Sequence, residues 1–145
     1  MTGGAVRAGR VVVGTLGLDQ HEVGAMAVAR LLMRQGFEVI YLGRFNTPEK
    51  MAATAEHEDA EVIGVSIHSW ELTAYVDDLV TAARRAGVAV VVGGSVLTED
   101  DRASLQGRGV DAVFGPWASE ETIVAALRDL VARVRAQRAT SAAER

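Results

Sequence analysis

Five short apolar runs, each followed by a longer amphipathic segment, most constrain what this chain can fold into. The runs are rich in valine and isoleucine and cover residues 10–14, 38–42, 62–67, 89–92 and 112–114. Runs of this length with few polar residues are typical of parallel strands that are covered on both faces of a sheet. Because parallel strands need crossover connections, the pattern predicts an α/β domain with a doubly wound, five-stranded parallel sheet.

Residues that start or stop helices stand between these runs. Thr47, Thr98 and Ser119 precede helical segments, and their side-chain oxygens are suited to cap free backbone N–H groups. Gly36 and Gly87 follow helical segments, at a position where a positive φ angle favours glycine. Strand–helix units in this order predict a flavodoxin-like (Rossmann-like) sheet with strand order 2-1-3-4-5 and helices on both faces.

The length of the chain, 145 residues with 49% hydrophobic residues, predicts one domain with a substantial core. We expect the folded domain to cover residues 10–136. The small and polar residues of 1–9 and 137–145 are typical of flexible ends.

The composition also excludes several functions. Cysteine is absent, which rules out disulfides, iron–sulfur clusters, thiolate zinc sites and cysteine nucleophiles. The formal net charge is −4 and no basic stripe is present, so neither nucleic acid nor an anionic membrane is an expected partner. No apolar run is long enough to span a bilayer and the N-terminus lacks an apolar signal segment, so we expect a cytoplasmic protein.

Polar residues and glycines follow the predicted strands at the ends where open parallel sheets bind ligands. Asp19 and His21 follow the first strand, Ser66 ends the third, and Gly93-Gly94 ends the fourth. These residues are therefore expected at one edge of the sheet. The loop after the first strand is longer than most strand–helix connections, which indicates that it meets a large ligand.

The residue types at this edge predict a metal ligand beside a slot for a flat group. A carboxylate at Asp19 can accept a hydrogen bond from one imidazole nitrogen of His21, which leaves the other nitrogen for a metal. The Gly93-Gly94 pair allows a sharp bend or a close approach by a ligand, and Ser66 offers one hydroxyl. Burial of about 150 Å² of a heteroaromatic ring there would contribute on the order of 4 kcal/mol.

The motifs D-x-H-x-x-G at residues 19–24, Ser66 in the place of S-x-L, and Gly93-Gly94 resemble the cobalamin-binding domain of corrinoid-dependent mutases and methyltransferases. The resemblance implies that His21 is the lower axial ligand of cobalt, with Asp19 as its hydrogen-bond partner, and that both residues serve catalysis. It also implies that Ser66 anchors the benzimidazole nitrogen and that the two glycines line the pocket for the nucleotide tail.

Further cofactor contacts are expected at the positions that flank these motifs: Gln20, Glu22, Val23, Gly24, His68, Pro116 and Trp117. Two of them depart from the family pattern. His68 stands where leucine is usual, and Trp117 stands where glycine is common.

The resemblance is strongest to the small subunits of acyl-CoA mutases of the methylmalonyl-, isobutyryl- and 2-hydroxyisobutyryl-CoA type. It implies a B12-dependent isomerase with adenosylcobalamin as cofactor. It also implies a large TIM-barrel subunit that binds the substrate, without which this chain would be inactive.

Other functions stay open at this point. A glutamate (methylaspartate) mutase-like small subunit is the nearest alternative. A corrinoid carrier for methyl transfer is less favoured, since such carriers usually have a helical bundle before this domain. A zinc site from Asp19, His21 and His68 is a further possibility. A phosphoacceptor receiver would need an aspartate where Ser66 stands, and a dinucleotide enzyme would need G-x-G-x-x-G after the first strand.

Overall fold

The computed structural model describes residues 7–17, 22–67 and 73–144. In these ranges, strands and helices alternate along the chain. The strands are β1 (Arg10–Leu16), β2 (Glu38–Asn46), β3 (Val62–Ser66), β4 (Ala89–Gly93) and β5 (Ala112–Phe114). The helices are α1 (Val23–Arg34), α2 (Pro48–His57), α3 (Thr73–Ala86), α4 (Glu99–Gly107) and α5 (Glu120–Ala143).

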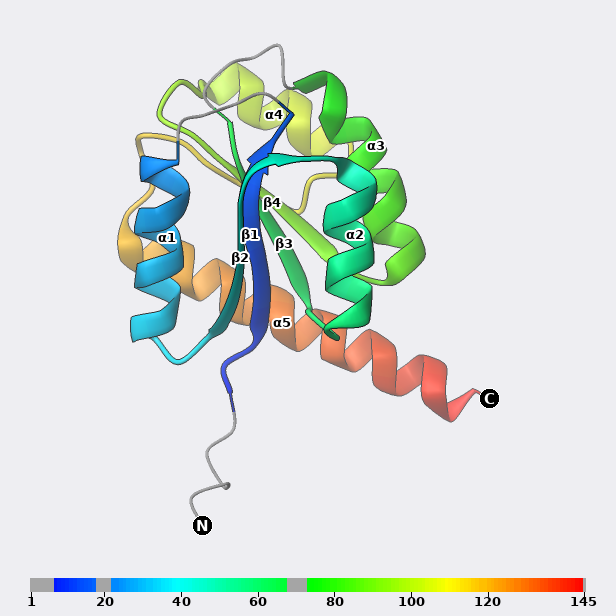
Figure 1. Ribbon diagram of the computed structural model, residues 1–145. Helices are drawn as coiled ribbons and strands as arrows, with labels where there is room; N and C mark the ends of the chain where they lie inside the picture. Colours follow the sequence, from blue (N-terminus) through cyan, green and yellow to red (C-terminus); the bar gives the residue numbers. More distant parts are fainter. Residues whose placement is uncertain (1–6, 18–21, 68–72, 145) are drawn as a thin grey trace.

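The strands form one parallel sheet in the order β2-β1-β3-β4-β5 (Figure 1). Helices α1 and α5 cover one face of the sheet, and α2 and α3 cover the other. The predicted fold class and strand order are therefore confirmed.

Two hydrophobic cores lie on the two faces because strand side chains alternate in direction. On β3, Ile63 and Val65 belong to the core that contains α2, α3 and Leu105 of α4. Val62 belongs to the core under α1 and α5, and so does Val91 of β4. No helix in the described ranges has the length and hydropathy needed to cross a membrane.

The predicted helix caps are present. Thr47 Oγ1 accepts a hydrogen bond from the Lys50 N–H, and Ser119 Oγ accepts one from the Thr122 N–H. Thr98 forms a reciprocal capping box with Asp101. These caps satisfy N–H groups that have no partner within their own helix.

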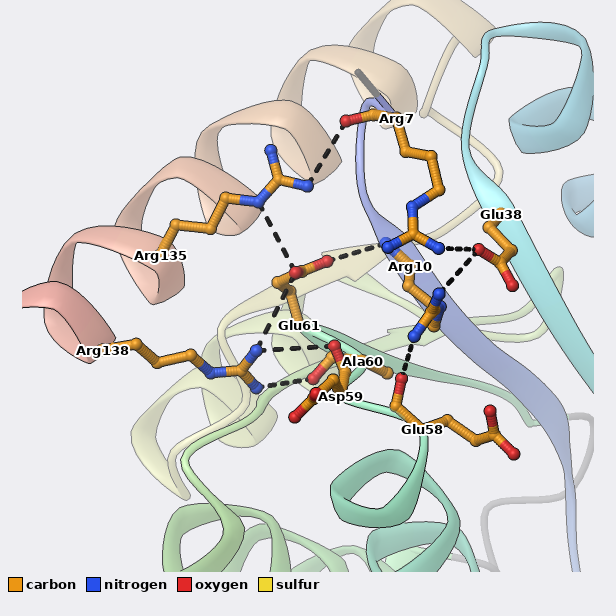
Figure 2. Close-up of polar contacts among 9 residues, drawn as sticks. All are labelled: Arg7, Arg10, Glu38, Glu58, Asp59, Ala60, Glu61, Arg135 and Arg138. Atoms are coloured by element: carbon orange, nitrogen blue, oxygen red, sulfur yellow. Dashed lines mark hydrogen bonds and ion pairs between the residues drawn. The ribbon is translucent and has the colours of Figure 1, made fainter. Parts of the chain in front are cut away.

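Strand β2 and helix α5 extend furthest beyond their predicted ends. Strand β2 continues to Asn46, because its last residues still pair with β1 after two register shifts. In the sequence, Gly43 interrupts the apolar run, so this continuation was not predicted. Helix α5 continues to Ala143, although residues from 137 onward were expected to be flexible. Arginine and alanine favour helix, and the Arg138 guanidinium donates a 2.7 Å hydrogen bond to the Ala60 carbonyl (Figure 2).

Candidate functional site

A cavity of about 470 Å³ lies between the sheet and helices α1 and α5, toward the C-terminal ends of the strands. Its volume is in the range of small-molecule binding sites. The strands contribute these residues to the lining: Val11, Val13, Gly64, Val65, Ser66, Val91, Gly93 and Phe114. The folded chain thus has a cavity at the C-terminal ends of the strands, where a ligand site was predicted.

The cavity exists because residues become smaller along the strands on this face. In β3 the face begins with Val62 and continues with Gly64 and Ser66, and in β4 Val91 is followed by Gly93. A methyl group added at Gly64 would be 3.4 Å from Val91 Cγ2. The absence of side chains at Gly64 and Gly93 therefore leaves room between the sheet and the helices.

The two adjacent glycines Gly93 and Gly94 have different roles. At Gly94 an added Cβ would lie 2.1 Å from the Ile67 carbonyl oxygen, so only glycine allows the chain to pass β3 here. At Gly93 the nearest atom, the Phe114 carbonyl oxygen, would be 3.5 Å away, an ordinary contact. Gly94 permits the close backbone approach, whereas Gly93 keeps the cavity open.

Helices α1 and α5 form the opposite wall. Val23 and Gly24, at the start of α1, line the cavity together with Val28, and α5 contributes Ile123 and Leu127. Val23 is 83% exposed, which is unusual for a large apolar side chain. The structure therefore brings two predicted contacts, Val23 and Gly24, to the same cavity as Ser66 and the two glycines.

The cavity lining is mostly apolar. Ser66, which is 7% exposed, and Ser95 supply its hydroxyl groups. Ser66 was predicted from the sequence, whereas Ser95 and the strand glycine Gly64 were not. A glycine inside a run of valine and isoleucine often marks a place where a ligand or another backbone segment approaches the strand. Gly64 could have been predicted from this pattern. Ser95 carries no such signal.

Pro116 and Trp117, the two cofactor contacts predicted after β5, lie in different surroundings. Pro116 lines the cavity, whereas Trp117 does not belong to its described lining. The Trp117 ring instead covers Gly115, where an added Cβ would lie 2.2 Å from the ring. The Arg102 guanidinium stands 6.0 Å from the Trp117 ring centroid. Trp117 therefore packs toward α4.

Glu22, another predicted contact, is held by the edge strand β2. The Tyr41 hydroxyl donates a 2.7 Å hydrogen bond to Glu22 Oε1, and Arg44 Nε lies 3.2 Å from Glu22 Oε2. Burial, together with the hydrogen bond and negative charge of Glu22, raises the pKa of Tyr41 to about 12, and Arg44 opposes this rise. Glu22 is the first described residue after the predicted metal ligand.

The remaining predicted residues, Asp19, Gln20, His21 and His68, lie outside the described ranges. Within those ranges, no group of three or more histidine, aspartate or glutamate residues is placed to hold a metal ion. Thr15 is fully buried near the end of β1.

The sequence profile of the B12 binding domain matches residues 9–127, most of the chain. This chain belongs to the B12-binding domain family. The match includes β1 to β5, the segment with Asp19 and His21, and both walls of the cavity. The cofactor class predicted from the sequence motifs is therefore confirmed.

Among curated relatives, this B12-binding domain is similar to two small subunits of mutases. It is 37% identical over 125 residues to the 2-hydroxyisobutanoyl-CoA mutase small subunit of Aquincola tertiaricarbonis, covering 85% of this chain and 92% of that protein. It is 39% identical over 132 residues to the pivalyl-CoA mutase small subunit of Xanthobacter autotrophicus, covering 89% and 88%.

The solved structures agree on the fold. A cobalamin-binding protein from Desulfitobacterium hafniense superposes with a TM-score of 0.71 at 20% identity, over 85% of this chain and 59% of that one. At this identity the likeness concerns the fold alone.

The chemistry of the cavity fits part of a cobalamin. A benzimidazole is flat and apolar with one ring nitrogen that accepts a hydrogen bond. The cavity offers apolar walls, missing side chains at Gly64 and Gly93, and the hydroxyls of Ser66 and Ser95. The residues present therefore suit the nucleotide tail of the cofactor that gives the family its name.

Proposed function

We propose that this B12-binding domain is the cobalamin-carrying small subunit of an adenosylcobalamin-dependent acyl-CoA mutase. The observation that carries the proposal is the apolar cavity between the sheet and helices α1 and α5. It lies at the edge of the sheet where the D-x-H motif follows β1. The similarity to mutase small subunits, over most of both chains, supports the same assignment.

His21 would be the residue that holds the cobalt of the cofactor, and the Asp19 carboxylate would orient its imidazole through a hydrogen bond. The Ser66 hydroxyl would donate a hydrogen bond to the benzimidazole nitrogen. Val13 and Val91, which line the cavity, would supply apolar wall for the ring, and Gly93 would leave it room. When bound, adenosylcobalamin supplies the radical chemistry through its cobalt–carbon bond.

The finer parts of the proposal concern the partner and the substrate. The names of the relatives support an acyl-CoA substrate and a second, large subunit. We propose that this large subunit is a TIM barrel that binds the substrate. We propose that this chain holds the cofactor in the cytoplasm and is inactive without that subunit.

Retention of cobalamin tests the proposal directly. The purified protein is mixed with cobalamin, desalted and examined by visible absorption. We expect a retained corrinoid spectrum, altered or lost in His21→Ala and Ser66→Ala. His57→Ala is the matched control, because His57 is an exposed residue at the end of α2. If wild-type protein retains no cobalamin, even with a candidate large subunit present, the proposed function is wrong.

A further inference from the structure

One wall of the cavity is a tight turn that follows the edge strand β5. The turn covers residues 115–118, and a 3.0 Å hydrogen bond from the Ala118 N–H to the Gly115 carbonyl closes it. Gly115, Pro116 and Ala118 line the cavity, whereas Trp117 does not belong to its described lining. Three residues of the turn thus border the cavity, and the fourth stands outside it.

This wall has little support from the sheet. Strand β5 has three residues and lies at the edge of the sheet, so β4 alone pairs with it among the described strands (Figure 1). A 3.0 Å hydrogen bond from the Gly94 N–H to the Phe114 carbonyl joins the ends of these strands, one residue before the turn begins. Because atoms beside a void lack partners on that side, the position of the turn depends more on contacts from its outer side.

The Trp117 ring supplies such a contact. It covers the α-carbon of Gly115, where an added Cβ would lie 2.2 Å from ring atom Cζ3 and 2.3 Å from Cη2. The φ angle of Gly115 is not in the left-handed region, so the backbone conformation does not by itself require glycine. The ring occupies the space of a side chain at Gly115, and the glycine and the tryptophan therefore depend on each other.

Helix α4 holds the ring from its other side. The Arg102 guanidinium lies 6.0 Å from the Trp117 ring centroid, within the range of a cation–π contact, and its Nη1 is 3.5 Å from Glu99 Oε2. Trp117 is 39% exposed, so most of its surface is covered in the folded chain. The ring thus connects the cavity wall to a helix that contributes no residue to the described lining.

We propose that Trp117 is a positioning residue that holds the turn 115–118 in place as a wall of the cavity. This inference rests on the proposed function, since it assumes that the cavity takes the nucleotide tail of cobalamin. Trp117 acts through Gly115 and its neighbours in the turn and needs no contact with the cofactor. Because a wall that is already ordered loses less conformational freedom when a ligand binds, the ring raises the affinity for cobalamin.

Trp117→Ala tests the positioning role, because it removes the ring and leaves the three lining residues unchanged. We expect cobalamin affinity, measured by visible absorption, to fall on the order of 10-fold, the size expected when the backbone of about one residue has to be ordered on binding. Trp117→Phe keeps an aromatic ring to cover Gly115 and should retain most of the affinity. Met33→Ala is the matched control, since it removes an exposed apolar side chain in the last turn of α1, outside the described cavity lining.

Gly115→Ala tests the same contact from the other side. The added methyl group takes the space of the ring and displaces it, although the tryptophan stays in the chain. We expect a loss of affinity similar to that of Trp117→Ala. The double variant should lose less than the product of the two effects, because both substitutions break one contact. Gly107→Ala, where nothing lies within 4 Å of the added Cβ, should match wild type.

Amide hydrogen exchange separates positioning from a loss of overall stability. The Ala118 N–H reports on the turn, because its hydrogen bond to Gly115 closes the turn. The Asp111 N–H, which donates a 2.8 Å hydrogen bond to the Val90 carbonyl, reports on the opposite end of β5. In Trp117→Ala without cofactor, we expect exchange to become faster at Ala118 and to stay unchanged at Asp111. Bound cobalamin should slow the exchange at Ala118 again.

The outcomes distinguish this inference from the proposed function. If wild type and Trp117→Ala bind cobalamin with equal affinity, the positioning role is wrong and the proposed function stands. The role is also wrong if affinity falls while exchange at Ala118 is unchanged, since Trp117 would then act on the ligand directly. Equally faster exchange at Ala118 and Asp111 would show an effect on overall stability, which contradicts positioning. If wild type binds no cobalamin, the proposed function fails and this inference fails with it.

Discussion

In this B12-binding domain, the end of the sheet where the strands begin (the N-terminal edge) and the end where they finish (the C-terminal edge) are built in opposite ways. At the N-terminal edge, charged side chains pair with one another and with backbone groups (Figure 2). At the C-terminal edge there is a cavity with apolar walls, and the large side chains Val23, Phe45, Val96 and Trp117 are exposed. One edge pairs most of its charged groups, although Arg10 Nε is buried there without a hydrogen-bond partner among the described residues, and the other edge leaves apolar surface uncovered.

Glu61 is the centre of the N-terminal edge. It is only 7% exposed, and its Oε1 accepts a 2.7 Å hydrogen bond from the Arg10 backbone N–H. Its other oxygen lies 3.5 Å from Arg135 Nε and 3.8 Å from Arg138, so α5 is tied to the start of β3. This arrangement anchors the last turns of α5, which is a contribution to stability.

The comparison teaches where the chain stabilises itself and where it is arranged to bind. An unfilled cavity lowers stability, because its walls lose contacts that a packed core would have. Exposed apolar residues at the same end of the sheet add to that cost and mark a site of interaction. Substitutions at the two edges should therefore separate stability from cofactor binding.

The largest effect is expected at Gly94, where the backbone just after β4 passes close to the backbone just after β3. Gly94→Ala places a Cβ against the Ile67 carbonyl, 2.1 Å away, and neither backbone can yield. We expect a loss of about 3 kcal/mol or more in the free energy of unfolding, measured by urea denaturation. Gly107→Ala is the control, since nothing lies within 4 Å of its added Cβ and alanine favours a helix. Equal stability of the two variants would contradict this reading of Gly94.

Next in size is the effect of filling the cavity at Gly93. Gly93→Val adds apolar volume where only ordinary contacts are met, so the free energy of unfolding should change by less than about 1 kcal/mol. Cobalamin affinity should fall about 100-fold, because the added side chain takes the space of the ring. Gly93→Ala should lie between wild type and valine. Wild-type affinity in Gly93→Val, measured by visible absorption, would show that the cavity is not the tail site.

A smaller effect is expected from Glu61→Ala at the opposite edge. The variant leaves the Arg10 N–H without its acceptor, at a cost of about 1–3 kcal/mol, whereas the ion pairs with exposed arginines add about 0–1 kcal/mol. Glu61→Gln keeps the acceptor and should retain most of the stability. Cobalamin affinity should not change in either variant. A loss of affinity in folded Glu61→Gln would break the contrast between the edges.

The smallest effect concerns the ionisation of Tyr41. Its pKa is raised from 10.0 to about 12, so the folded state holds the proton more firmly than the unfolded state. The stability that this supplies is complete below pH 10 and is lost as the pH rises toward 12. In Glu22→Gln the tyrosinate absorbance attributable to Tyr41, identified by difference from Tyr41→Phe, should appear at lower pH. An unchanged titration would show that Glu22 does not hold Tyr41 in solution.

Much of the fold was predictable because its signals are local. Strand runs, caps at Thr47, Thr98 and Ser119, and the glycines after helices depend on neighbouring residues, and each was found as expected. The end of α5 was not predicted, because its helix is held by contacts of Arg138 with residues nearly eighty positions earlier. Strand β2 was predicted too short for a similar reason, since its last residues pair with β1 through irregular register.

The sequence by itself determined the family, the strand order and the edge of the sheet where the motifs gather, because these follow from periodicity and motif spacing. Only the tertiary structure decided what each residue does there. Gly93 and Gly94 are adjacent residues of the same type, yet Gly93 keeps a cavity open and Gly94 permits a close backbone contact. Trp117 turned toward α4, and Glu22 was bound by β2. These differences depend on which distant backbone lies nearby, and no local pattern records that.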